Sequence, residues 1–311
     1  MSLATLSAAA AGSSWWAATS NRRAVRWLRR IVADSRRPVL TPVHKPTPGK
    51  WSDNQITICW LGHSTTLINF YGFWILTDPA LANRVGVQLG LGTAGPKRFI
   101  APALSCKDLP PLDLILVSHA HMDHLDLPTL GAIPAKTLVI TAKLTSDLMA
   151  SAGREQVKEL GWNESARVKS GSSTLDVRAF EVKHWGQRWP GELERGYNGY
   201  VLRREGKALL FGGDTALTDT FSNLRSQGPF EAAIMPIGAY RPWIRNHCTP
   251  DQALEMSNNS GAKYIIPVHH QTFRLSDEPM MEPIERMKAA LSNEPERLGI
   301  VAIGETFVCP A

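Results

Sequence analysis

Cysteine is scarce in this sequence. Four cysteines occur in 311 residues, and no two of them form a CxxC pair: Cys59, Cys106, Cys248 and Cys309. Such wide spacing provides neither a disulfide framework nor a cysteine-based zinc site, and it favours reduced thiols in the cytoplasm. We therefore exclude a small disulfide-stabilised secreted domain and expect a cytoplasmic protein.

Long hydrophobic runs are also missing. No stretch reaches the roughly 18 consecutive apolar residues that indicate a membrane-spanning helix. Hydrophobic residues still make up 43% of the chain, which suffices for a substantial buried core at this length. The composition is therefore that of a globular protein.

Acidic residues are rare only near the N-terminus. Residues 1–50 contain nine lysines and arginines but a single acid, Asp34, whereas the remaining residues contain 25 basic and 27 acidic side chains. The net charge of +6 therefore belongs to an N-terminal arm, and the rest of the chain is almost neutral. Because a phosphate backbone requires a basic track beside the active site, this distribution argues against a nuclease or another nucleic-acid-binding protein.

The arm is predicted to have three parts. Its Ala- and Ser-rich start lacks the charged beginning and long apolar core of a secretory signal. The helical pattern that follows places Trp27, Leu28 and Ile31 opposite five arginines, so this apolar face either packs on the body or rests on a membrane surface. We expect a disordered start at residues 1–19, a basic amphipathic helix at 20–37 and a proline-rich connector at 38–50. One body domain follows at residues 51–311.

The body alternates between predicted strands and helices. Its first three strands are joined by short turns and should be antiparallel. Two successive sets of strands, each followed by helices, predict two packed sheets faced by helices, with functional side chains at one set of strand ends. The pattern predicts a loop at 83–105, a short helix or turn at 128–133, and helices at 144–152, 250–261 and 282–291. The predicted strands lie at 56–60, 65–70, 73–77, 112–117, 137–141, 157–160, 173–182, 199–203, 208–211, 232–236, 264–268 and 300–308.

The strongest chemical signal is the stretch LDLILVSHAHMDHLDL at residues 112–127. An apolar run of strand length leads directly into four side chains of metal-ligand type, namely His119, His121, Asp123 and His124. Two residues apart, His119 and His121 point the same way from an extended backbone, while the other two can serve a second centre beside the first. The stretch predicts one half of a two-metal site.

The order of these motifs resembles the metallo-β-lactamase superfamily. SHAHMDHLDL is followed by His184, by FGGDT with Asp214 and by PVHHQTF with His269, a spacing that extends over most of residues 56–310. WLGHSTTLI, LTDP, KHW, GAYRPW and VHHQTFRLSDEP look most like the branch that contains N-acyl-phosphatidylethanolamine phospholipase D. This resemblance implies an α/β fold, a four-layer αββα sandwich with one or two metals at its edge.

The resemblance also implies which residues bind two Zn²⁺ ions, with Mn²⁺ or Fe²⁺ as alternatives. Three imidazoles suit one metal, two imidazoles with a carboxylate suit the other, and a second carboxylate bridges them. The first metal would be held by His119, His121 and His184, and the second by Asp123, His124 and His269. The bridging carboxylate would be that of Asp214. The two aspartates are also the expected catalytic residues.

The tandem His269-His270 leaves two candidates for the last ligand. The branch tends to have Trp-Gly after this ligand, whereas this chain has His270-Gln271. We assign the ligand to His269, because the buried strand at 264–268 delivers its next side chain to the metal edge. His270 is then expected to point towards substrate or solvent.

Other residues near the motifs are candidates for orienting the ligands or contacting a substrate. Hydrogen bonds from neighbouring polar side chains fix metal ligands, and this role suits His63, Asp78, Asp126 and His247. Guanidinium groups offer forked donors to phosphate oxygens. The candidates for substrate contacts are Trp185, Trp189, Tyr197, Tyr240, Arg241, Trp243 and Arg245.

The expected activity is hydrolysis. A hydroxide bridging two cations can attack a phosphodiester, and the branch resemblance points to N-acyl-phosphatidylethanolamine or another phospholipid as the substrate. The alternative is a lactonase or sugar-phosphate lactone hydrolase, because relatives of this fold open cyclic esters at the same metal cluster. We expect a small-molecule or phospholipid substrate, with peripheral membrane contact through residues 20–37 and no prediction of the oligomeric state.

Overall fold

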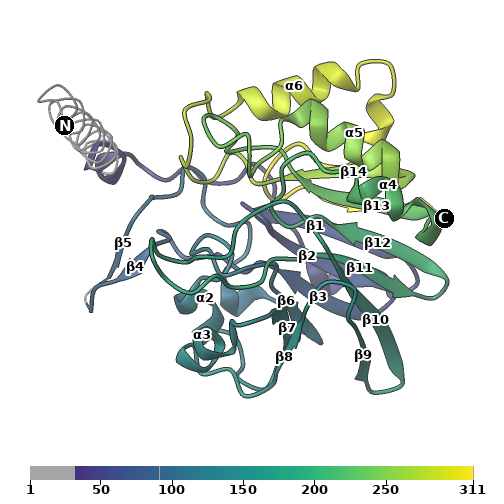
Figure 1. Cartoon of the computed structure of the whole chain (residues 1–311), viewed down its shortest axis with the longest axis horizontal. Helices are drawn as coiled ribbons and strands as arrows, with labels where there is room; N and C mark the ends of the chain where they lie inside the picture. The colour runs from purple at the N-terminus through teal and green to yellow at the C-terminus, as the bar shows by residue number, and fades with distance from the viewer. Residues whose placement is uncertain (1–31, 91, 311) are drawn as a thin grey trace, which may run out of the picture.

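Two packed β-sheets with helices on their outer faces make up the protein (Figure 1). The structure is a computed structural model that describes residues 32–90 and 92–310. The predicted αββα sandwich is confirmed. Most of the helix predicted in the arm lies outside the described residues, and none of the described helices is long and apolar enough to span a membrane.

The first sheet contains seven strands in the order β15-β1-β2-β3-β6-β7-β8. Strands β1, β2 and β3 form the predicted antiparallel meander, and β3, β6, β7 and β8 run parallel to one another. The bounds are β1 Ile56–Gly62, β2 Thr65–Phe70, β3 Phe73–Thr77, β6 Leu114–Leu116, β7 Leu138–Ala142, β8 Val157–Leu160 and β15 Thr306–Val308.

The second sheet contains six strands in the order β14-β13-β12-β11-β10-β9. Strands β9, β10, β11 and β12 pair antiparallel in succession, while β12, β13 and β14 run parallel to one another. The bounds are β9 Ser165–Ser170, β10 Ser173–Phe180, β11 Gly199–Arg204, β12 Lys207–Phe211, β13 Phe230–Pro236 and β14 Ala262–Val268.

Short and medium α-helices cover the outer faces of the sheets (Figure 1). The helices over the first sheet contribute Leu130 and Met149 to the main core, and those over the second contribute Met256 and Met287 to a separate core cluster. Their bounds are α2 Leu127–Gly131, α3 Ser146–Ser151, α4 Thr220–Asn223, α5 Pro250–Ser260 and α6 Glu282–Ala290; single 3₁₀ turns span Pro48–Lys50, Cys106–Asp108, Arg225–Gln227 and Pro295–Arg297.

Helix α5 begins and ends where its sequence predicts. The Thr249 side chain accepts a hydrogen bond from the Gln252 backbone, and the Gln252 side chain accepts one in return from the Thr249 N–H. At the other end Gly261 adopts φ 80°, a left-handed conformation that costs glycine little. The helix lies against β13 and β14 and packs with α6, so it helps hold the strand ends that carry the site.

Two parts of the strand prediction are wrong. The stretch 300–308 is a strand only at β15, because the Glu305 carboxylate accepts hydrogen bonds from the backbone of Val301 and Ala302 at 2.7 and 3.1 Å and folds this segment into a turn. Strand β9 is missing from the prediction, since SARVKS presents charged side chains on its exposed face. The expected loop at 83–105 contains a small hairpin of β4 Val87–Gln88 and β5 Thr93–Ala94.

The described end of the arm packs on this loop. Residues 32–36 are helical, and Leu40 exchanges backbone hydrogen bonds with Phe99 and Ala101, both at 2.8 Å. The Arg37 guanidinium lies 3.5 Å from the centre of the Phe99 ring. Residues 32–40 therefore belong to the surface of the body, and the division of the chain at residue 50 stays a prediction.

Candidate metal centre

Strand ends from both sheets meet at one edge of the sandwich. The loop between β6 and α2 carries the cluster from His119 to His124, and in the second sheet His184, Asp214 and His269 follow β10, β12 and β14. In sheets with parallel strands, ligands bind beyond the carboxyl ends of the strands. Side chains predicted from motifs far apart in the sequence are thus brought into one place.

The first group consists of His119, His121 and His184. The Nδ1 atom of His121 lies 2.8 Å from Nε2 of His119 and 3.1 Å from Nε2 of His184. Hydrogen bonds hold the other ring nitrogen of two of these histidines. His119 Nδ1 contacts the Ser118 hydroxyl at 2.8 Å, and His184 Nδ1 donates to the Asn246 carbonyl at 2.9 Å. These contacts turn both Nε2 atoms towards the centre of the group.

The second group consists of Asp123, His124 and His269, with His63 beside it. Asp123 Oδ2 lies 3.5 Å from Nε2 of His124 and 3.6 Å from Nε2 of His269. The other ring nitrogen of His124 donates to the buried carboxylate of Asp78 at 2.6 Å, as expected for a residue that orients a ligand.

Asp214 lies between the two groups. Its Oδ2 atom is 3.0 Å from Nε2 of His269, 3.1 Å from Nε2 of His124 and 3.9 Å from Nε2 of His184. The same atom is 3.7 Å from Nδ1 of His247, so this histidine also faces the site. A carboxylate in this place can contact cations in both groups.

Several buried atoms at this edge have no hydrogen-bond partner among the described residues. They are Nε2 of His121 and His124, Oδ1 of Asp214, Nδ1 of His247 and both ring nitrogens of His269. Leaving a buried polar atom unpaired costs about 1–3 kcal/mol. Three of these nitrogens, on His124, His247 and His269, lie within 4 Å of Asp214 Oδ2 and therefore face one place. Imidazole nitrogen and carboxylate oxygen are among the donors that zinc prefers, so the residues fit the metal that the fold implies.

Burial and neighbouring charges divide the histidines into two kinds. Burial lowers the pKa of His119 and His184 well below the ordinary value, and that of His121 and His247 to about 4. At His269 burial acts in the same direction, but Asp214 and Asp123 outweigh it and raise the pKa to about 9. The first group is therefore neutral, as metal ligands must be, and the second contains a carboxylate–imidazolium pair that a cation can replace.

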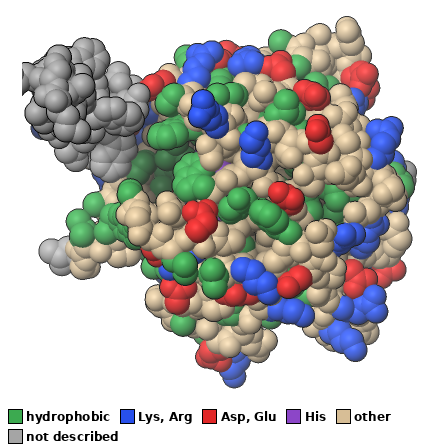
Figure 2. Space-filling view, in the orientation of Figure 1, with side chains coloured by type: hydrophobic (Ala, Val, Ile, Leu, Met, Phe, Trp, Pro, Cys, Tyr) green, Lys and Arg blue, Asp and Glu red, His purple; other side chains and the backbone are tan. Residues whose placement is uncertain are grey.

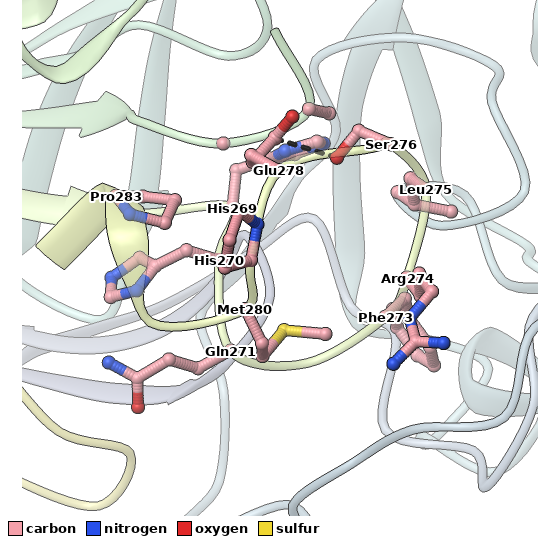
Figure 3. A pocket seen from close by; sticks show the side chains of 13 residues that line it. His269, His270, Gln271, Phe273, Arg274, Leu275, Ser276, Glu278, Met280 and Pro283 are labelled. Carbon is pink, nitrogen blue, oxygen red and sulfur yellow. Dashed lines mark hydrogen bonds between the residues drawn. The ribbon is translucent and has the colours of Figure 1, made fainter. Parts of the chain in front are cut away.

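His270 does not point towards solvent, so that half of the expectation is wrong, while a contact with substrate stays a prediction. Its ring is buried and stacks on the Trp60 indole, with 4.4 Å between ring centres. His269 has a φ of 64°, so the chain turns sharply between the two side chains and sends them in different directions. Both residues line a crevice with Phe273, Leu275 and Met280 (Figure 3). This geometry supports His269 as the ligand, which stays a prediction.

Three other candidates have structural partners. The Asp126 carboxylate caps α2 by accepting from the Thr129 backbone at 3.2 Å, and it orients no ligand among the described residues. The Tyr240 hydroxyl and the Arg241 guanidinium both bind Glu282 at the start of α6, at 2.8 and 2.7 Å. They fasten a loop to a helix, whereas Arg245 in the same loop is exposed.

Sequence reasoning misses residues that act through backbone contacts. Arg188 donates to the carbonyl oxygens of Ala120 and Leu125 at 2.6 and 2.9 Å, so it fixes the loop that carries the first four ligands. No side-chain pattern could reveal this role, because its partners are carbonyl groups. Trp185, a predicted neighbour of the site, has its ring centre 4.4 Å from that of His121.

Comparisons with known proteins agree with this geometry. A family model described as a β-lactamase superfamily domain matches residues 73–270. The chain belongs to the metallo-β-lactamase superfamily. It is therefore a metal-dependent hydrolase.

Two relatives of this hydrolase are named for an activity on phospholipids. The N-acyl-phosphatidylethanolamine-hydrolyzing phospholipase D 1 of Caenorhabditis elegans is 32% identical over 263 residues, which cover 79% of this chain and 73% of the relative. The mitochondrial N-acyl-phosphatidylethanolamine-hydrolyzing phospholipase D of Saccharomyces cerevisiae is 31% identical over 265 residues, which cover 80% of this chain and 55% of the relative. An uncharacterised protein of Mycobacterium tuberculosis is 30% identical over 268 residues, covering 83% and 70%.

Solved structures share the fold of this hydrolase at low sequence identity. An isothiocyanate hydrolase from Delia radicum gut bacteria superposes with a TM-score of 0.65 at 18% identity, covering 82% of this chain and all of that one. A metallo hydrolase from Ignicoccus hospitalis gives a TM-score of 0.60 at 18% identity, covering 83% and 99%. These likenesses concern the fold alone.

Proposed function

We propose that this hydrolase cleaves a phosphodiester bond in a phospholipid, with N-acyl-phosphatidylethanolamine as the first candidate. The observation that carries the proposal is the pair of ligand groups on either side of Asp214, in a chain with phospholipase relatives. His119, His121 and His184 would hold one metal; Asp123, His124 and His269 would hold the other. Two divalent cations, with Zn²⁺ as the first candidate, would activate water at neutral pH and neutralise charge on the phosphate.

The side chains around the two groups suit a substrate with an anionic head and apolar chains. His121 and Asp123 remain partly exposed and mark the opening of the site. The partly exposed Met280 beside His269 can contact an apolar chain, and the exposed Arg245 can reach for a phosphate. Arg241 is less available for this role, because its guanidinium pairs with Glu282 at 2.7 Å.

Six of the thirteen exposed large hydrophobic side chains in the described residues lie on the loops that carry the site. Figure 2 shows hydrophobic side chains gathered beside a hollow on one face of the molecule. Soluble proteins rarely expose large apolar patches without a binding partner. We define the apolar rim as the exposed hydrophobic residues on the loops of His184, Asp214, His247 and His269: Trp189, Leu193, Leu217, Trp243, Ile244 and Met281.

We propose that the apolar rim holds the enzyme on a lipid surface. The charged side chains of the same loops include both signs, for example Arg245 and Glu192, so attraction to anionic lipid contributes less than apolar insertion. This places membrane contact at the mouth of the site, in addition to or instead of the predicted helix at 20–37. A substrate could then enter the crevice directly from the lipid.

A substrate comparison tests the proposed activity. Zinc-loaded protein should hydrolyse N-acyl-phosphatidylethanolamine in vesicles and a chromogenic phosphodiester, and each activity should disappear with a chelator and return with zinc. Lactones form the third arm of the comparison. Faster turnover of a lactone than of any phosphodiester would assign the protein to the lactonase alternative.

A double substitution tests the apolar rim. Leu193→Ala with Ile244→Ala should weaken vesicle binding at least tenfold, since burying each such side chain contributes about 1.5–3 kcal/mol. Turnover of the soluble chromogenic substrate should stay within a factor of two, roughly, because neither side chain is a proposed ligand. Co-sedimentation with phosphatidylcholine vesicles measures the binding.

Two controls distinguish binding by the rim from binding by the arm or by any exposed apolar group. Val308→Ala removes a comparably exposed apolar group, 44% against 45% for Ile244, on a strand outside the rim, and should change nothing. Deletion of residues 1–31 removes most of the predicted arm helix but keeps the contacts of Arg37 and Leu40 with the body. If this deletion abolishes vesicle binding while the double substitution leaves it intact, the arm is the membrane anchor and the rim is not.

A further inference from the structure

His63 occupies an unusual position between β1 and β2. Its backbone has a φ of 52°, in the left-handed region, and its side chain is 1% exposed. A non-glycine residue in a sparsely populated conformation costs about 1–3 kcal/mol and is retained where the surroundings require it. Such residues are concentrated at functional sites, so the contacts of His63 indicate its role.

The backbone of His63 joins the first sheet to the segment that follows β14. Its N–H donates to the Thr272 hydroxyl at 2.6 Å, and its carbonyl accepts from the His269 N–H at 2.9 Å. The Trp60 indole donates to the same carbonyl at 2.6 Å. The backbone of the last ligand, His269, is therefore held directly by His63.

The side chain of His63 reaches the other half of the second group. Its Nε2 atom lies 2.8 Å from Oδ2 of Asp123, and its Nδ1 atom has no partner among the described residues. An ionised carboxylate only accepts hydrogen bonds, so the ring proton must be on Nε2. The ring centre is 4.2 Å from that of His269, which places the imidazole between the two ligands that it contacts.

We infer that His63 is a positioning residue for the second metal group, a role that rests on the proposed binuclear function. It orients the Asp123 carboxylate through Nε2–H and fixes His269 through its own carbonyl. No comparable contact joins His63 to His119, His121 or His184 in the described part of the chain. Loss of the imidazole should therefore weaken one of two metal sites and spare the other.

Two variants of His63 separate positioning from direct coordination. His63→Asn suits the positive φ but is too short to reach Asp123, whereas His63→Gln can place an amide N–H near the former Nε2. Competition with a chromogenic chelator gives the zinc affinity of each site without any substrate. His63→Asn should lower one of the two affinities about 10–100-fold, in the range known for residues that orient ligands.

His63→Gln should restore that affinity to within about threefold of wild type, because the hydrogen bond to Asp123 is what matters. His270→Gln is the matched control: this ring is equally buried and close in space, but it stacks on Trp60 and contacts no metal group among the described residues. It should leave both affinities unchanged.

Three results would overturn the inference or its basis in distinguishable ways. Equal loss in His63→Asn and His63→Gln, with matching changes in the visible spectrum of the Co²⁺-loaded protein, would make His63 a ligand. Two unchanged affinities in His63→Asn would deny it any role in metal binding. Fewer than two zinc equivalents in the wild-type protein would instead refute the binuclear proposal, whatever the variants show.

Discussion

Replacing Asp214 by asparagine should reduce hydrolysis by about 10³-fold or more, a loss of about 4 kcal/mol in transition-state stabilisation. Within the described chain, Asp214 is the one carboxylate with an oxygen within 4 Å of ligand nitrogens from both groups. Asparagine keeps the shape but removes the negative charge and one acceptor oxygen, so the two cations would lose their shared ligand. The kcat of zinc-saturated protein on a chromogenic phosphodiester measures the effect.

The control for this prediction lies on the same loop. Asp219→Asn changes an exposed carboxylate that makes no cap hydrogen bond to α4 and should leave both kcat and zinc content unaltered. Zinc content of Asp214→Asn should fall below two equivalents. An Asp214→Asn enzyme that retained a tenth of the wild-type rate would show that this carboxylate is dispensable, and the proposed shared role would have to be abandoned.

Asp78→Ala should be the most destabilising single change near the site. This fully buried carboxylate accepts hydrogen bonds from the Ser118 backbone at 2.7 Å, the Ser118 hydroxyl at 2.6 Å and His124 Nδ1 at 2.6 Å. Removing it leaves these donors unpaired, at a cost of about 3–5 kcal/mol in the free energy of unfolding. Because His119 also relies on Ser118, affinity should fall in both metal groups, by about 10–100-fold.

Urea unfolding of metal-free protein measures the stability cost of Asp78→Ala, and zinc titration measures the affinity. Asp176→Ala is a suitable comparison, since it removes a solvent-exposed ion pair with Arg167 and should cost at most about 1 kcal/mol. If Asp78→Ala unfolds in the same urea concentration as wild type, the hydrogen bonds around Ser118 do not stabilise the site.

Local patterns predict most of the architecture and the residues that gather at the site. The apolar run before His119 has the length and composition of a strand that is buried on both faces, as β6 is. A polar ligand side chain directly after such a run stands out in the sequence. The caps of α5 are equally local, since Thr249 and Gln252 satisfy each other's backbone groups. Such features require no knowledge of what the rest of the chain does.

Roles that depend on distant partners could not be predicted. Arg241 looks available for phosphate because nothing near it in sequence is acidic, yet folding brings Glu282 within 2.7 Å of it. Asp126 resembles its neighbours in the ligand cluster, but the chain turns into α2 there and uses the carboxylate as a cap. The side chains of His269 and His270 point in different directions because the backbone of His269, directly after β14, has a positive φ.

The position of the site at the edge between the two sheets has a mechanical consequence. His119 to His124 belong to the first sheet, whereas His184, Asp214 and His269 belong to the second. Cations bound by both sets would act as a cross-link between segments far apart in sequence, as a disulfide does in proteins that can form one. A chain with four free cysteines would in this way gain a removable clamp, and the two halves of the sandwich would separate more readily once its metals are withdrawn.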